Sequence, residues 1–213
     1  MKTNIENKYP IIAVGRLRMG IDGEGIRSLI VVEGCPLRCR YCINPFSWDG
    51  SVKAKMFTAG DLYEKIRIDR PYILATNGGV TFGGGEPLLY PEMISEFRRI
   101  CDPEMTIYAE TSLNVPIENI KAAIDATDRF IVDIKTANKN VYLNYTGNDS
   151  DRVFENLRYL LDMKGNDHIT VRIPVIPGFA DETECRNTGK ILCEMGVRDF
   201  DYFRYTVPNQ VVQ

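Results

Sequence analysis

The chain has 213 residues, 44% hydrophobic and 26% charged, with a formal net charge of −3. This length suffices for one sizeable core, and the charge balance argues against nucleic acid as the main partner. No apolar run reaches the length of a membrane-spanning helix, and the polar first residues lack the apolar stretch of a signal peptide, so we expect a cytoplasmic protein with no membrane partner.

Short apolar runs alternate with amphipathic segments along the chain. In order, the pattern predicts strand 28–33, helix 61–68, strand 79–82, helix 91–101, strand 105–109, helix 116–126, strand 130–134, helix 151–163, strand 168–176, helix 181–195 and strand 200–205.

The alternation of strand and helix favours an α/β fold with a parallel sheet. About six β/α units are too few for a closed eightfold barrel, so we expect a partial, open parallel β/α barrel. Without repeats or linkers, residues 1–213 are expected to form a single domain in which residues 1–10 are loosely ordered. In such sheets the chemistry lies at the carboxyl ends of the strands.

Three of the six cysteines, Cys35, Cys39 and Cys42, directly follow the first predicted strand. Three thiols at this spacing can converge on one metal centre, yet they leave a four-coordinate zinc or a four-iron cluster one protein ligand short. The alternatives are core packing, or a zinc loop that borrows a ligand such as His168. The spacing favours an iron–sulfur cluster with one open iron. The remaining cysteines are scattered and are expected in the core or on helices: Cys101, Cys185 and Cys193.

The cysteine pattern resembles that of the radical S-adenosylmethionine (SAM) superfamily. The resemblance implies a [4Fe-4S] cluster whose open iron is chelated by SAM, and reductive cleavage of SAM to a 5′-deoxyadenosyl radical. Tyr41, just before the third cysteine, matches the aromatic position beside the adenine in that family. Its alternative role is packing beneath the loop.

A glycine-rich turn ends the second predicted strand. Gly84 and Gly85 allow backbone groups to approach a ligand closely, and Glu86 can accept a hydrogen bond from an ammonium group. The turn is similar to the Gly-Gly-Glu segment of radical SAM proteins, which implies that it holds the amino group of SAM. A plain tight turn is the alternative.

Charged residues end the later strands. Lys135 can balance a carboxylate, and Asp133 can bond ribose hydroxyls or a cation. The strand ends resemble segments of the activases, the enzymes that activate glycyl radical enzymes. This likeness implies that Glu110, Asp133 and Lys135 contact SAM, and that a monovalent cation binds near Glu110 and Asp133. Arg172 resembles an activase arginine near SAM. The alternatives are solvated strand ends for Asp133 and Lys135, and an ion pair across helices for Arg172.

Further segments resemble the glycyl-radical-enzyme activases of the pyruvate formate-lyase activating type. Residues 22–27 are similar to their Asp-Gly-Pro-Gly-Ile-Arg stretch, and Asn44-Pro45 and Trp48-Asp49 match segments after the cysteines. The resemblance implies an anaerobic oxidoreductase that takes hydrogen from a glycine of a partner glycyl radical enzyme. It also implies reduced flavodoxin or ferredoxin as electron donor.

The sequence departs from that family at several places. Ile43 and Thr206 stand where many relatives have histidine, and the chain stops at Gln213, where relatives usually continue. Two alternatives therefore stay open. One is a radical SAM enzyme acting on another peptide or a small molecule, and the other is a non-catalytic iron–sulfur or zinc protein.

Overall fold

The computed structural model describes residues 7–205, which form two compact units. The described part of the first unit comprises residues 7–35, 44–111 and 115–130, and that of the second comprises residues 36–43, 112–114 and 131–205. The strands of this part of the chain make one eight-stranded, mostly parallel sheet that does not close. The predicted α/β class and open parallel architecture are thus confirmed.

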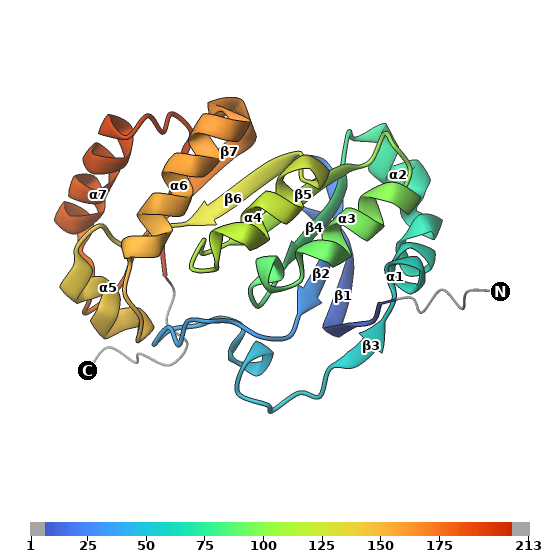
Figure 1. The fold of residues 1–213 in the computed structure, drawn as a ribbon, viewed down its shortest axis with the longest axis horizontal. Helices are drawn as coiled ribbons and strands as arrows, with labels where there is room; N and C mark the ends of the chain where they lie inside the picture. Colours follow the sequence, from blue (N-terminus) through green and yellow to red (C-terminus); the bar gives the residue numbers. More distant parts are fainter. Residues whose placement is uncertain (1–6, 206–213) are drawn as a thin grey trace. The chain divides into compact units, whose positions relative to one another are not determined.

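The first unit contains five strands in the order β3-β1-β2-β4-β5. β1 pairs antiparallel with β2 and β3, whereas β2, β4 and β5 run parallel. Helices α1, α3 and α4 pack in succession beside these strands (Figure 1). The elements are β1 (Tyr9–Met19), β2 (Ile26–Val32), β3 (Lys55–Phe57), α1 (Ala59–Ile66), α2 (Arg70–Ala75), β4 (Gly79–Gly83), α3 (Pro91–Ile100), β5 (Thr106–Thr111) and α4 (Ile117–Ala123).

Arg27, at the start of β2, is fully buried and links three parallel strands. Its guanidinium donates to the Thr81 hydroxyl at 2.7 Å and to the hydroxyl and carbonyl of Thr106 at 2.8 and 3.0 Å. It also lies 3.6 Å from the ring centre of Tyr108. Burial lowers the pKa of Arg27 to about 10, and the acceptors and the ring compensate the buried charge. Residues 22–27, which resemble an activase motif, therefore build the amino end of the sheet.

The second unit contains β6, β7 and β8, of which β7 and β8 run parallel. The turn after β6 is bound to α7, because the Thr136 hydroxyl donates to Glu184 at 2.6 Å and the Ala137 amide donates to the Thr188 hydroxyl at 2.9 Å. The elements are β6 (Arg129–Asp133, of which the last three residues belong to this unit), α5 (Lys139–Thr146), α6 (Asp151–Lys164), β7 (Ile169–Val175), α7 (Glu182–Glu194) and β8 (Phe200–Arg204).

Each predicted strand and helix corresponds to an observed one within a few residues. The sequence analysis missed β1, β3, α2 and α5. The expectation of loose order at residues 1–10 falls partly on residues 1–6, outside the described residues, and Tyr9 and Pro10 begin β1. The single domain remains a prediction. No helix in the described part of the chain combines the length and apolarity needed to cross a bilayer.

Candidate functional site

The three clustered cysteines follow β2, where Gly34 adopts a φ of 93° and its amide donates to the Ser47 carbonyl at 2.6 Å. All three are of intermediate exposure and none is in a disulfide, and thiolates are the protein ligands of iron–sulfur clusters, so the donor chemistry fits such a group. Cys35 belongs to the first unit, and Cys39 and Cys42 belong to the second. Within residues 7–205, no three His, Cys, Asp or Glu side chains lie close enough together to hold a metal ion. The convergence of the three thiols stays a prediction.

The last turn of α5 holds the cysteine loop. The amides of Arg38 and Arg40 donate to the carbonyls of Thr146 and Tyr145 at 2.8 and 3.1 Å. The last carbonyls of a helix have no hydrogen-bond partner within the helix, and here the amides of the cysteine loop are their donors. Gly147 ends the helix in the left-handed conformation, with a φ of 75°. The helix end therefore fixes the backbone on both sides of Cys39.

Lys135 is a buried cation beside this loop, with 6% of its surface exposed. Its Nζ donates to the Tyr205 hydroxyl at 3.0 Å and lies 3.4 Å from Oδ2 of Asp133. Burial on its own lowers the pKa of Lys135, but Asp133, Tyr205 and Cys39 raise it well above the ordinary lysine value. Burial raises the pKa of the Cys39 thiol, and Lys135 opposes this effect. The unit thus presents a charged ammonium next to a predicted metal ligand.

Tyr41 lies in an aromatic cluster of the second unit. Its ring packs edge-on against Tyr145 and Phe179, with centroids 6.1 and 5.8 Å apart, and those two rings are 5.1 Å apart. Tyr205 also contacts this cluster. The sequence analysis did not propose Tyr145, Phe179 or Tyr205 as site residues. The glycine that ends α5, directly after Tyr145 and Thr146, was a signal that could have drawn attention to this helix end.

The turn formed by Gly84, Gly85 and Glu86, which we call the glycine loop, lies in the first unit directly against the chain that leads into Cys35. A side chain on Gly85 would place its Cβ 2.2 Å from the Gly34 carbonyl oxygen, and one on Gly84, whose φ is 87°, would meet Val31 at 2.3 Å. The Glu86 amide donates to the same Gly34 carbonyl at 2.8 Å. Only glycine permits these approaches.

Glu86 is 1% exposed, and its position is fixed by hydrogen bonds. Its Oε1 accepts from the Thr111 hydroxyl at 2.7 Å and from the Leu88 amide at 3.2 Å. Asn44, from the predicted Asn-Pro segment, donates to the Gly84 carbonyl at 3.2 Å. The segments before and after the cysteines are thus both tied to the glycine loop.

The remaining predicted residues are divided between the units. Glu110 ends β5 in the first unit, next to Gly83 of β4, while Asp133 ends β6 in the second, so a cation site that both share stays a prediction. Arg172 on β7 lies opposite Asp201 on β8, with Nε and Oδ2 3.4 Å apart. Arg172 thus forms an ion pair, although with the neighbouring strand and not across helices, and its contact with SAM stays a prediction. Thr206 lies outside the described residues.

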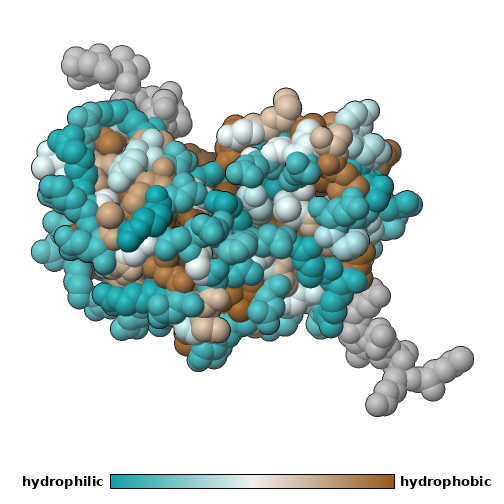
Figure 2. Space-filling view, turned by 90° about the horizontal axis from the view of Figure 1, so that it is seen from above, coloured by the Kyte–Doolittle hydropathy of each residue, from teal (hydrophilic) through white to brown (hydrophobic). Residues whose placement is uncertain are grey.

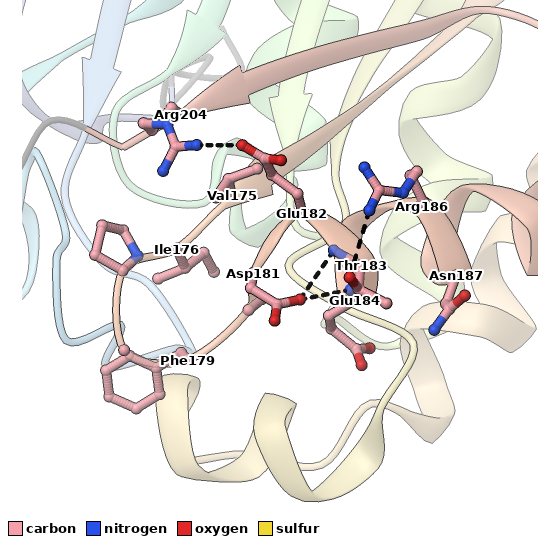
Figure 3. A pocket seen from close by; sticks show the side chains of 13 residues that line it. Val175, Ile176, Phe179, Asp181, Glu182, Thr183, Glu184, Arg186, Asn187 and Arg204 are labelled. Carbon is pink, nitrogen blue, oxygen red and sulfur yellow. Dashed lines mark hydrogen bonds and ion pairs between the residues drawn. The ribbon is translucent and has the colours of Figure 1, made fainter.

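A cavity of about 790 Å³ lies in the second unit where β7 ends and α7 begins (Figure 3). Arg204 donates to Glu182 across it at 2.7 Å, and Asp181 caps α7 by accepting from two amides. Phe179 lines this cavity and also contacts Tyr41. None of the predicted site residues lines it. The carboxyl end of β7 therefore borders a cavity whose lining residues were not predicted from the sequence.

Comparison with known proteins identifies a matching family model and several relatives. The model of the radical SAM superfamily matches residues 29–184. The chain is 31% identical to the pyruvate formate-lyase 1-activating enzyme of Escherichia coli K12, over 83% of this chain and 72% of that enzyme. It is 32% identical to the pyruvate formate-lyase-activating enzyme of Clostridium pasteurianum, over 77% and 68%.

Two solved structures resemble the fold. A domain of a pyruvate-formate lyase-activating enzyme from Bacteroides vulgatus matches with a TM-score of 0.52 and 25% identity, over 62% of this chain and 86% of that chain. Streptococcus suis SuiB bound to its precursor peptide SuiA matches with a TM-score of 0.64 and 14% identity, over 84% of this chain and 38% of that chain, which supports the fold alone. Because both the family model and the relatives span most of its length, this chain belongs to the radical SAM superfamily and, within it, to the family of pyruvate formate-lyase-activating enzymes.

Proposed function

We propose that this enzyme activates a glycyl radical enzyme by taking a hydrogen atom from the α-carbon of a glycine in that partner. One observation carries the proposal within this family. Three partly exposed cysteines outside any disulfide follow β2, and one of them, Cys39, lies near enough to the buried ammonium of Lys135 for that charge to lower the pKa of its thiol against the effect of burial.

In the proposed site, Cys35, Cys39 and Cys42 hold three irons of a [4Fe-4S] cluster and leave the fourth iron to SAM. When bound, this cluster supplies the electron that cleaves SAM to methionine and a 5′-deoxyadenosyl radical. Lys135, held by Tyr205, offers its ammonium to the SAM carboxylate.

The other residues bind and orient SAM. Glu86 accepts from the amino group of SAM, and its hydrogen bonds within the loop preset its position. Gly84 and Gly85 leave room for close backbone contact, and Tyr41 packs beside the adenine. Arg172 lies near SAM at the β7 strand.

Acidic side chains at two strand ends complete the proposed site. Asp133 bonds the ribose hydroxyls, and Glu110 and Asp133 together hold a monovalent cation. The protein substrate is a glycyl radical enzyme, at the loop that carries its reactive glycine. Reduced flavodoxin or ferredoxin is the electron donor. The family of this chain supports the protein substrate, and the electron donor rests on the resemblance found in the sequence.

The deciding experiment follows the fate of SAM. The protein is reconstituted anaerobically with iron and sulfide and reduced with dithionite, and the products are separated by chromatography. We expect 5′-deoxyadenosine and methionine from the wild type and from Cys193→Ala, which removes an exposed thiol on α7, but not from Cys39→Ala.

Two other outcomes would each favour one of the alternative functions. If an iron centre forms, SAM stays whole and SAM leaves the EPR signal of the centre unchanged, the chain is a non-catalytic cluster protein. If SAM is cleaved but no glycyl radical signal appears in any glycyl radical enzyme supplied as partner, the substrate is another peptide or a small molecule.

A further inference from the structure

A second cavity, of about 460 Å³, lies in the first unit among β1, β3 and α1. Its apolar lining includes Ile11 and Phe57, and no acidic residue lines it. Four cationic side chains surround this lining: Arg16, Lys53, Lys55 and Lys65. We call this cavity the β3 pocket; β3 itself is an edge strand of the sheet (Figure 1).

Of these four cations, only Arg16 forms an ion pair within the described residues, and the Lys65 ammonium lies 5.0 Å from the ring centre of Phe57. Arg16 is matched by Asp69, which accepts from its Nε and a terminal nitrogen at 2.5 and 2.7 Å. Lys53, Lys55 and Lys65 are exposed, and no acidic side chain of the described residues forms an ion pair with any of them. A positive rim around an apolar floor is complementary to an acidic protein surface.

Hydrogen bonds from Thr58 and, less strongly, the charges of Lys8 and Lys65 lower the pKa of the Asp61 carboxyl, so Asp61 offsets only part of the positive charge. Asp61 lies one turn earlier on α1, where its carboxylate accepts from the Thr58 amide at 2.9 Å in a capping box. Edge strands often carry lysine to prevent pairing with other chains, and Lys55 serves that purpose equally well. Lys53 and Lys65 lie outside the edge strand, so edge protection does not account for the cluster.

Strand register places the pocket close to the first predicted iron ligand. Ile11 of β1 pairs with Lys55 on one side and with Val32 of β2 on the other. Cys35 follows Val32 by three residues, a span of at most about 11 Å of chain. The pocket therefore lies at the carboxyl end of β2, the end from which the cysteine loop starts.

We propose that the β3 pocket is the docking surface of an acidic one-electron carrier protein that reduces this enzyme. The inference rests on the proposed function and adds a place for its electron donor. The carrier is oxidised by one electron and the iron–sulfur centre is reduced by that electron, while no bond forms or breaks. Val52, which lines the pocket next to Lys53 and is 41% exposed, supplies apolar contact area of the kind that docking surfaces need.

Charge reversal tests the proposal. The triple variant Lys53→Glu, Lys55→Glu, Lys65→Glu is compared with a control that makes the same charge change on the second unit. The control replaces exposed cations of α6 and α7: Arg152→Glu, Arg158→Glu and Lys190→Glu. Calorimetry measures the dissociation constant of flavodoxin and the reconstituted enzyme at low and high salt, and EPR follows reduction by reduced flavodoxin and, separately, by dithionite.

We expect the triple variant to bind flavodoxin at least about tenfold more weakly at low salt, with a smaller salt dependence than the wild type. Reduction by flavodoxin slows correspondingly, reduction by dithionite is unchanged, and the control behaves as wild type. Equal affinity in the triple variant and the control overturns the docking site. If the triple variant fails to fold by circular dichroism, Lys53→Glu alone, in a loop, is expected to weaken binding measurably, and wild-type affinity there also overturns it. If dithionite drives no SAM cleavage in the wild type and SAM leaves the EPR signal of the centre unchanged, the proposed function is overturned instead.

Discussion

Replacing Gly85 with alanine tests whether the glycine loop must touch the chain that leads into Cys35. The new Cβ would lie 2.2 Å from the Gly34 carbonyl oxygen, whereas real Cβ atoms keep at least 3.0 Å, so the two backbones must separate by at least the difference, 0.8 Å. That movement strains the 2.8 Å hydrogen bond from the Glu86 amide to Gly34. Overpacking destabilises by about 1–3 kcal/mol and a lost backbone hydrogen bond by about 0.5–1.5 kcal/mol, so we expect a loss of about 2–4 kcal/mol.

Two measurements check this expectation. Urea unfolding followed by circular dichroism gives the free energy of unfolding, and iron content after reconstitution reports whether Cys35 is still in place. The matched control is Gly60→Ala on α1, where the nearest atom to a Cβ is the Thr58 hydroxyl at an ordinary 3.5 Å. It is expected to be neutral or stabilising by up to about 1 kcal/mol. Wild-type stability and full iron in Gly85→Ala would refute the reasoning.

Three further substitutions probe other parts of the site and fold. Lys135→Ala is expected to weaken SAM binding while iron content is retained, and an unchanged SAM dissociation constant would remove Lys135 from the site. Gly147→Ala, at a φ of 75°, is expected to lower the free energy of unfolding in urea by about 1–2 kcal/mol and Gly147→Asn by less; equal losses would contradict the left-handed cap. Hydrogen bonds from Thr58 lower the pKa of Asp61 below its ordinary 3.8, so its contribution is present above that value and is lost as pH falls through the folded pKa. The melting temperatures of wild type and Asp61→Asn are therefore expected to differ at neutral pH and to converge in acid; a gap that persists in acid would contradict this.

The parallel core was predictable because its signal is local. The buried strand β6 reads Phe130, Ile131 and Val132 in succession, a run typical of a strand covered on both faces. α6 shows helical spacing of its apolar residues and was predicted within one residue of its observed end. These elements depend on side-chain pattern, which the sequence displays directly.

β1 and α5 were missed because their stability comes from elsewhere. β1 has two register shifts and a left-handed residue, Leu17, with a φ of 53°, and it depends on pairings with distant strands. α5 has eight residues with little amphipathic pattern and depends on its ends, where the Asn138 side chain accepts from two amides and Gly147 terminates the helix.

For the candidate site too, the residue types could be predicted from the sequence, whereas their surroundings could not. Thiols, glycines and strand-end charges could be proposed from their spacing, but the partners of those groups could not. Lys135 bonds Tyr205, seventy residues later in the chain, and Glu86 bonds Thr111. Such contacts arise only when the strands are assembled, so burial and pKa effects were outside the reach of the sequence.

In the first unit, the hydrogen bonds of Arg27 and the predicted site residues lie at opposite ends of the parallel strands. The buried guanidinium anchors β2, β4 and β5 near their amino ends, while Cys35, the glycine loop and Glu110 follow or lie at their carboxyl ends. Loops at the carboxyl ends can therefore change in length and sequence while the anchor keeps the strands in register. A scaffold organised in this way lets evolution, or a protein engineer, exchange the recognised substrate without rebuilding the fold.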